Sequence, residues 1–197
     1  MKLTKADILG KAAYEQARPD FRRRVMVQKD KRRVPVGNNC TIHVENRDTM
    51  HYQVQEMLRA ENSWQRQGAV EEELEAYNAL IPGPGELSAT MMLEDETAAE
   101  RARMLPQLVG IERHLKLQIG DTPPIVAAFD RGQIDEHKVS SVQYVKWTLS
   151  EEQVRVLGAD GTVVRIVIDH PAYTAQAILS EETRKAISQD PLSYTRA

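Results

Sequence analysis

The chain has 197 residues with a net charge of −3, and 41% of its residues are hydrophobic and 28% charged. Such a chain can bury a core without disulfide or metal staples, and its net charge provides no overall attraction to nucleic acid or anionic membranes. The polar start MKLTKAD and the lack of an apolar run of about 18 residues argue against a secretory signal or a membrane span. Since its single cysteine, Cys40, excludes an intramolecular disulfide and CxxC motifs, we expect a cytoplasmic protein.

Capping and proline signals predict helices in the first part of the chain. Thr4 and Asp7 form a capping-box pattern, and a helix is expected to start at Pro19 and to end before Val34. The segment Cys40 to about Glu45 has the β-branched alternation of a strand. Residues 48–67 and 69–80 then predict two antiparallel helices separated by Gly68.

Strands dominate the expectations for the remainder of the chain. ELSATMMLE alternates, with its apolar residues on one face, and Thr97 starts a short helix. IERHLKLQI, PPIVAAF, SSVQYVKWTL, TVVRIVI and AYTAQAIL predict further strands, and SEEQVRVL and SEETRKAIS predict short helices. Without regular βαβ alternation, this order indicates an α+β fold with a mostly antiparallel mixed sheet. We expect a single domain, 1–197, in which 1–80 is mainly helical with one strand and 81–197 is mainly strands with short helices.

Polar side chains gather from the end of the first strand into the following helix, in the run ENRDTMHYQVQEMLRAE. On a helical wheel, one side is apolar, and the opposite side, with Tyr52 and Gln55, is expected to face water. Glu61 falls within the apolar stripe next to Met57 and Trp64. It is therefore expected to reach the exposed end of the helix, to pair with a cation such as Arg47 or the Arg22–Arg24 run, or to serve a site. The candidate ligand pocket contains Glu45, Arg47, Asp48, Gln53, Glu56, Arg59 and Glu61.

Three further groups of residues carry weaker hypotheses. His43, Glu45 and His51 are candidate metal ligands, although their spacing matches no established metal motif. The segment 18–33 has eight Arg or Lys against two Asp and could bind phosphates, but Phe21 is its single aromatic residue, so it lacks an interleaved series of rings for base stacking. Asp169 could orient His170, but turn formation explains this pair better, because no serine nucleophile motif accompanies it.

The run ENRDT followed by YQVQEMLRAE resembles a bacterial family known as domain-of-unknown-function family 3501. LTKADI, ARPDFRRRV, RRVPVG, EEELEAYNALIP, LVGIE and VIDHPAY extend the resemblance over most of the chain. Genes of this family tend to lie beside those of rubrerythrin-like proteins and iron–sulfur oxidoreductase subunits. The resemblance therefore implies an association with peroxide or oxygen stress, but no activity.

Three hypotheses on function follow. The first is a non-catalytic accessory protein that binds a rubrerythrin-like or iron–sulfur redox protein. The second is an enzyme or small-ligand-binding protein that uses the polar pocket between Glu45 and Glu61. Nucleic-acid binding by the basic helix at 18–33 is a distant third. The sequence specifies no cofactor and leaves the formation of homo-oligomers open.

Overall fold

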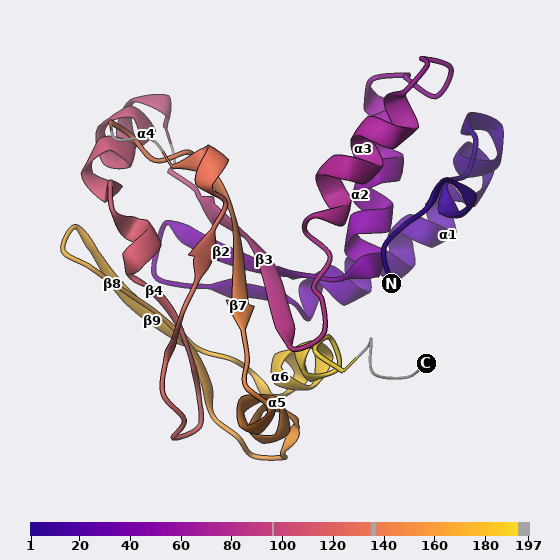
Figure 1. Ribbon diagram of the computed structural model, residues 1–197. Helices are drawn as coiled ribbons and strands as arrows, with labels where there is room; N and C mark the ends of the chain where they lie inside the picture. The colour runs from indigo at the N-terminus through magenta and orange to yellow at the C-terminus, as the bar shows by residue number, and fades with distance from the viewer. Residues whose placement is uncertain (96, 135–136, 193–197) are drawn as a thin grey trace.

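The computed structural model describes residues 1–95, 97–134 and 137–192 of the chain. Helices α1, α2 and α3 form one part of the molecule, and the strands with the shorter helices α4, α5 and α6 form the other (Figure 1). The helices are α1 (Lys11–Asp30), α2 (Arg47–Ala60), α3 (Ala69–Asn78), α4 (Ala98–Met104), α5 (Glu151–Gly158) and α6 (Glu181–Ser188). The strands are β1 (Arg33–Pro35), β2 (Cys40–Glu45), β3 (Glu86–Leu93), β4 (Leu115–Ile119), β5 (Ile125–Val126), β6 (Ala128–Phe129), β7 (Val142–Thr148), β8 (Val164–His170) and β9 (Tyr173–Ile178).

The strands form two antiparallel sheets, which confirms the predicted α+β class with antiparallel pairing. The five-stranded sheet has the order β1-β2-β3-β7-β6, and the four-stranded sheet has the order β5-β4-β8-β9. One sheet was expected from the sequence, because alternation within a strand does not say which strands pair. The chain passes from one sheet to the other between β3 and β4, between β5 and β6, and between β7 and β8.

The main hydrophobic core lies between the two sheets. The predicted apolar face of β3, with Leu87, Ala89, Met91 and Leu93, is buried in it. From the other sheet, Leu115, Leu117 and Ile119 of β4 join the same core, together with alternate residues of β8. Side chains on the opposite face of the five-stranded sheet therefore point away from this core and toward the helical part.

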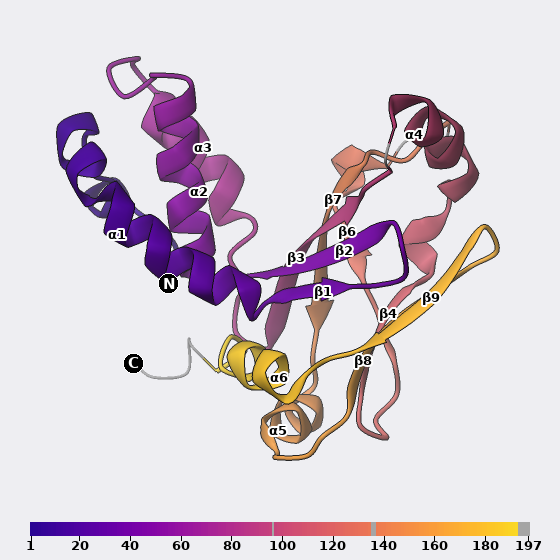
Figure 2. The same cartoon turned by 180° about the vertical axis from the view of Figure 1, so that it is seen from behind.

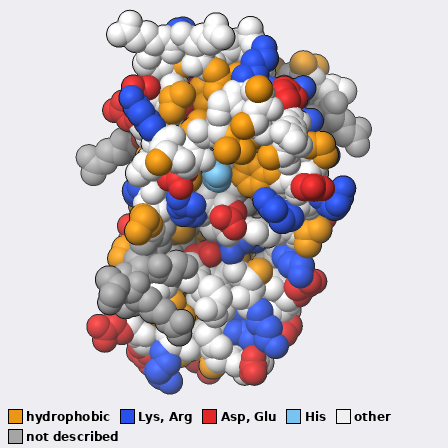
Figure 3. All heavy atoms as spheres, turned by 90° about the vertical axis from the view of Figure 1, so that its right-hand side faces the viewer, with side chains coloured by type: hydrophobic (Ala, Val, Ile, Leu, Met, Phe, Trp, Pro, Cys, Tyr) orange, Lys and Arg blue, Asp and Glu red, His pale blue; other side chains and the backbone are white. Residues whose placement is uncertain are grey.

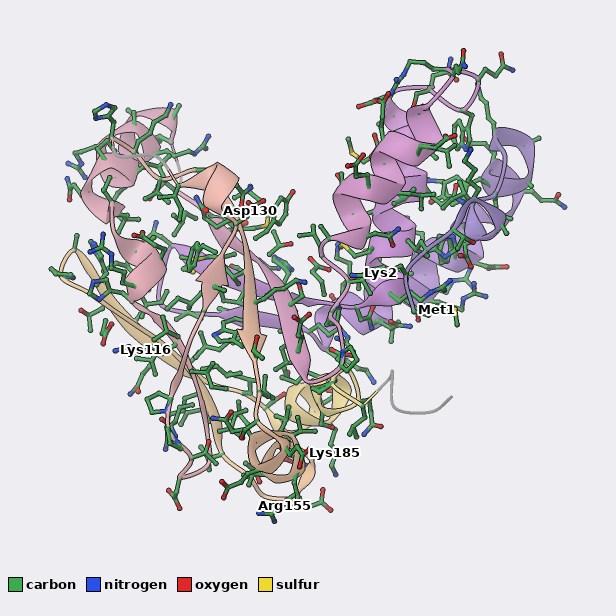
Figure 4. The ribbon with its side chains drawn as sticks, in the orientation of Figure 1. Met1, Lys2, Lys116, Asp130, Arg155 and Lys185 are labelled. Atoms are coloured by element: carbon green, nitrogen blue, oxygen red, sulfur yellow. The ribbon has the colours of Figure 1, made fainter. Side chains whose placement is uncertain are left out.

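The helical part has a core of its own, made mostly by α2 and α3. Met50, Val54 and Leu58 of α2 pack with Leu74 of α3 and with Ile81 in the connection that leads to β3. The N-terminal segment is fastened to the same connection, where the Lys2 ammonium group donates to the Ile81 carbonyl oxygen at 2.8 Å. Figure 4 shows Lys2 beside this connection.

Helix α1 differs from its prediction at both ends. It begins at Lys11, so Pro19 lies inside it, and it ends at Asp30. Proline removes one backbone hydrogen bond, but Tyr14 and Val25 are buried on either side of it and hold both halves against the fold. Residues Arg33–Pro35 then form β1, so the first 80 residues contain two strands where one was expected. Figure 2 shows the short β1–β2 hairpin directly after α1.

The two predicted antiparallel helices are confirmed as α2 and α3, but α2 ends at Ala60 and not near residue 67. Its end is a Schellman motif, in which Asn62 has the left-handed φ of 50°. Two backbone hydrogen bonds close this motif, from Ser63 N–H to the Leu58 carbonyl and from Asn62 N–H to the Arg59 carbonyl. In the described residues no helix is long and apolar enough to cross a membrane.

Candidate functional site

The predicted candidate pocket does not form one site, because α2 is covered on two sides. One side faces η1, a 3₁₀ turn at Lys5–Asp7, and α1, and the other faces the five-stranded sheet and α3. On the first side lie the contacts of Arg47, Glu56 and Arg59 with η1 and α1. On the second side, Gln53 lines a pocket next to the sheet. Since these directions diverge around the helix, the predicted residues cannot contact one common ligand.

Glu56 is held in a structural ion pair at the interface between α1 and α2. Its carboxylate accepts two hydrogen bonds from the Arg18 guanidinium, at 2.7 and 2.8 Å, and one from the Tyr14 hydroxyl at 2.6 Å. Hydrogen bonding to Arg18 is the main cause that lowers the pKa of Glu56 to about 2, while burial opposes it and Tyr14 adds to it. A carboxylate with these partners stabilises the helix packing and has little capacity left for a ligand.

This ion pair predicts a pH-dependent stability. Because the folded-state pKa of Glu56 lies below its unfolded value, its contribution is complete above about pH 4.5 and is lost as the pH falls toward 2. We expect Glu56→Gln to lower the free energy of unfolding by roughly 1–3 kcal/mol at pH 7 and by much less at pH 2.5. Urea unfolding of both proteins at the two pH values measures this. An equal loss at both values would contradict the assignment.

Three further residues of the predicted pocket form polar contacts near the surface. Arg47 pairs with Asp7 of η1 at 2.6 Å, and Arg59 pairs with Glu15 of α1 at 2.8 Å. Asp48 accepts a hydrogen bond from the Gln28 amide at 3.1 Å. These contacts fasten α2 to the N-terminal segments and do not converge on a cavity.

The side of α2 that was expected to face water is also packed. Tyr52 and Gln55 are buried, with exposed fractions of 7% and 0%. The Gln55 amide group pairs with the backbone N–H and C=O of Leu9, and the Tyr52 ring contacts Phe21 of α1. The expectation of a wet face was wrong because the N-terminal segment and α1 fold back over α2.

Glu61 does not lie within the apolar stripe of the helix. Helix α2 ends at Ala60, and Glu61 is its exposed C-terminal capping residue. The helical periodicity that placed Glu61 next to Met57 and Trp64 therefore does not continue through it. The predicted ion pair with Arg47 is also not formed, since Arg47 pairs with Asp7.

Glu45 and Gln53 line a pocket on the face of the five-stranded sheet that points away from the main core. The pocket has a volume of about 200 Å³ and lies between this face and helices α2 and α3. Figure 4 shows side chains of the helices and of the sheet directed into the space between these two parts. The lining residues are Lys29, His43, Glu45, Met50, Gln53, Tyr77, Thr90, Met92, Val142 and Tyr144.

Strand register explains how distant residues meet in this pocket. His43 of β2 lies opposite Thr90 of β3, which in turn lies opposite Tyr144 of β7. Because side chains alternate along a strand, Glu45 shares the face of His43, and Met92 shares the face of Thr90. Lys29, Tyr77 and Tyr144 were not expected in this pocket from the sequence. The alternation of β3 could have placed Thr90 and Met92 on this face, but not the residues of other elements.

The Glu45 carboxylate is buried, with an exposed fraction of 4%. Its two oxygens accept hydrogen bonds from the hydroxyl groups of Thr49, at 2.6 Å, and Thr90, at 2.8 Å. Among the described residues, no nitrogen of Lys, Arg or His lies within 4.0 Å of it as an ion-pair partner. Since a carboxylate can accept about four hydrogen bonds, Glu45 retains acceptor capacity beside the pocket.

Unlike Glu45, three polar groups of the pocket have no hydrogen-bonding partner within the described part of the chain. This holds for the Lys29 ammonium group, the His43 ring and the Tyr144 hydroxyl. Burial lowers the pKa of His43, an effect that the charge of Glu45 opposes, so the ring is neutral at pH 7. Burial also raises the pKa of Tyr144, and the charge of Glu45 adds to this, so the phenol keeps its proton. The pocket thus offers a cation, an anion and two neutral groups.

The three candidate metal ligands do not come together. His43 and Glu45 line the pocket, but the His51 ring packs against Phe21 of α1, with ring centroids 5.0 Å apart. The residues that the structure describes contain no group of three or more His, Cys, Asp or Glu side chains placed to hold a metal ion.

Asp169 and His170 do not form a catalytic pair. Asp169 bonds to His114 Nδ1 and to Lys116, whereas His170 Nε2 lies 3.1 Å from the Val109 carbonyl oxygen. Successive residues of β8 point to opposite faces of the sheet, which separates the two side chains. His170 Nδ1 accepts from the Ala172 N–H, so this histidine serves the turn, as the sequence suggested.

Half of the eight basic side chains in the segment 18–33 form ion pairs with acidic side chains among the described residues. Arg18 pairs with Glu56, Lys31 with Glu182, and Arg32 with Asp190. On the face turned to the viewer in Figure 3, acidic and basic side chains are interspersed and form no continuous basic stripe. Intramolecular pairing therefore accounts for much of this segment without a nucleic acid.

The fold is that of a solved α+β structure. A crystal structure described as a novel protein of unknown function from Burkholderia pseudomallei is 31% identical, with a TM-score of 0.89. The similarity covers 96% of this chain and 99% of that chain. The family model described as "Protein of unknown function (DUF3501)" matches residues 2–191. The chain therefore belongs to this family, which confirms the resemblance noted in the sequence. Among curated proteins no match is found.

Proposed function

We propose that this protein binds a small polar molecule in the pocket between the five-stranded sheet and helices α2 and α3. One observation carries the proposal: the Glu45 carboxylate is 4% exposed, has no ion-pair partner among the described residues, and borders a pocket of about 200 Å³. Burying a charge costs several kcal/mol unless other groups compensate for it. A bound molecule that donates hydrogen bonds to Glu45 would supply this compensation.

The remaining walls suit recognition of a small molecule. Met50, Met92 and Val142 provide apolar contact, while His43 and Tyr144 provide neutral hydrogen-bonding groups. Binding pockets commonly combine an apolar lining with a few polar groups that orient the ligand. The volume is smaller than the 300–1,000 Å³ that is usual for drug-sized ligands, which favours a small metabolite.

Native mass spectrometry of the full-length protein, purified from its native host in a mild buffer, tests this proposal. We expect the wild-type protein to retain a small molecule and Glu45→Gln to lose it. Glu94→Gln is the matched control, because Glu94 also accepts a threonine hydroxyl, from Thr41 at 2.7 Å, but lies outside the pocket. Wild-type protein without a retained molecule, or equal retention by all three proteins, would contradict the proposal.

Binding of a rubrerythrin-like or iron–sulfur protein stays a prediction that rests on the gene neighbourhood of the family. Affinity purification of the tagged full-length protein from its native host tests it directly. Repeated co-purification of a redox protein would support it, and the absence of any redox protein from repeated experiments would count against it.

A further inference from the structure

The pocket has charges of both signs, and this restricts the kind of molecule that it can bind. Glu45 of β2 and Lys29 of α1 both line it, yet they form no ion pair with each other. Both charges act on His43, since Glu45 raises and Lys29 lowers the pKa of this histidine. His43 lines the same pocket as both charged groups and shares its face of β2 with Glu45.

The hydrogen-bonding capacity that the chain leaves unused differs between the two charged groups. Glu45 already accepts two hydrogen bonds and can accept about two more. The Lys29 ammonium group has three N–H donors and, among the described residues, no acceptor or ion-pair partner. A complementary ligand thus presents N–H donors, preferably charged, to Glu45 and an anionic oxygen to Lys29.

We infer that the ligand is a small zwitterion that carries an ammonium group and a carboxylate, the chemistry of a free amino acid. This inference rests on the proposed function of the same pocket. Met50, Met92 and Val142 would contact the hydrocarbon part of the ligand between or beside its charged groups. The pocket volume of about 200 Å³ lies below the range usual for drug-sized ligands, which favours a molecule as small as an amino acid with a short side chain.

A purely cationic or purely anionic molecule fits less well. An amine without a carboxylate leaves the Lys29 ammonium group without an acceptor and close to a second positive charge. A carboxylate without an amine faces the charge of Glu45 and gives it no donor. Like charges in a partly buried site repel each other, so each half of the zwitterion loses affinity by itself.

Isothermal titration calorimetry of the full-length protein, with small probes that carry both charges or only one, tests the inference. The zwitterions are L-alanine, L-valine and 4-aminobutyrate. The half-ligands, which carry only one of the two charges, are butylamine and butyrate. We expect at least one zwitterion to bind about tenfold or more tightly than either half-ligand, since each lost charge-assisted contact costs about a factor of ten. Butylamine or butyrate that binds as tightly as every zwitterion would overturn the inference, and so would a failure of all five probes to bind.

Variants separate this inference from the proposed function. Lys29→Met should weaken binding of the preferred zwitterion about tenfold and leave the binding of butylamine unchanged or stronger. Lys31→Met is the control, because Lys31 pairs with Glu182 and does not line the pocket. Unchanged zwitterion binding by Lys29→Met would also overturn the inference. The wild-type protein could retain a molecule that is not a zwitterion and that only Glu45→Gln loses. In that case the inferred ligand class is wrong and the proposed function stands.

Discussion

Replacement of Arg32 by methionine is expected to lower the free energy of unfolding by about 3–5 kcal/mol, because it leaves a buried carboxylate without its cation. Arg32 and Asp190 are exposed by only 6% and 5%. The guanidinium donates to both carboxylate oxygens of Asp190, at 2.7 and 2.9 Å, and to the Ala186 carbonyl oxygen at 2.6 Å. The pair joins the segment between α1 and β1 to the end of α6, which are distant in the sequence.

Denaturant unfolding of a small set of variants at pH 7 measures this effect. Arg33→Met is the matched control: its side chain is exposed, and we expect a change below about 0.5 kcal/mol. The double variant Arg32→Met with Asp190→Leu should recover most of the lost stability, since no unpaired charge then remains buried. A loss below 1 kcal/mol in Arg32→Met would show that the ion pair does not hold these segments together.

Trp147→Ala is expected to destabilise the protein by about 3–5 kcal/mol through loss of packing between the two sheets. Trp147 of β7 is 1% exposed and belongs to the core that both sheets share. Its indole N–H is buried and meets no hydrogen-bond acceptor in the described part of the chain. Trp147→Phe should therefore cost clearly less, because it retains an aromatic ring and removes an unsatisfied donor.

The same unfolding measurement tests the packing of the sheets. Val126→Ala is the control, since Val126 of β5 is 50% exposed and should contribute less than about 0.5 kcal/mol. If Trp147→Ala lowered the free energy of unfolding no more than Val126→Ala does, this would contradict a core shared by the two sheets.

Local patterns were sufficient for most elements of the fold but not for their arrangement. Alternation in β3 correctly predicted its buried face, and Thr97 caps the start of α4 as expected. The end of α2 was missed because Asn62 stops the helix in a left-handed conformation, which glycine adopts more often. The division into two sheets depends on contacts between distant strands, and no local pattern reports these contacts.

Only some residues of the pocket could be named from the sequence, because α2 is packed on more than one side. The helical wheel assumed one packed face and one face in water, whereas α2 is packed against α1 and also faces the pocket. Glu45, one of the predicted residues, lines this pocket because it ends a strand just before this helix. Lys29 and Tyr144 could not be found from the sequence, since α1 and β7 reach the pocket only through the tertiary fold.

A crystal structure of the full-length protein, purified from its native host without added ligands, tests the proposed ligand site most directly. We expect density for a small organic molecule between Glu45, Lys29 and Tyr144, with a donor atom within hydrogen-bonding distance of the Glu45 carboxylate. Ordered water alone in this pocket, or a Glu45 carboxylate paired with a cation of the chain itself, would contradict it.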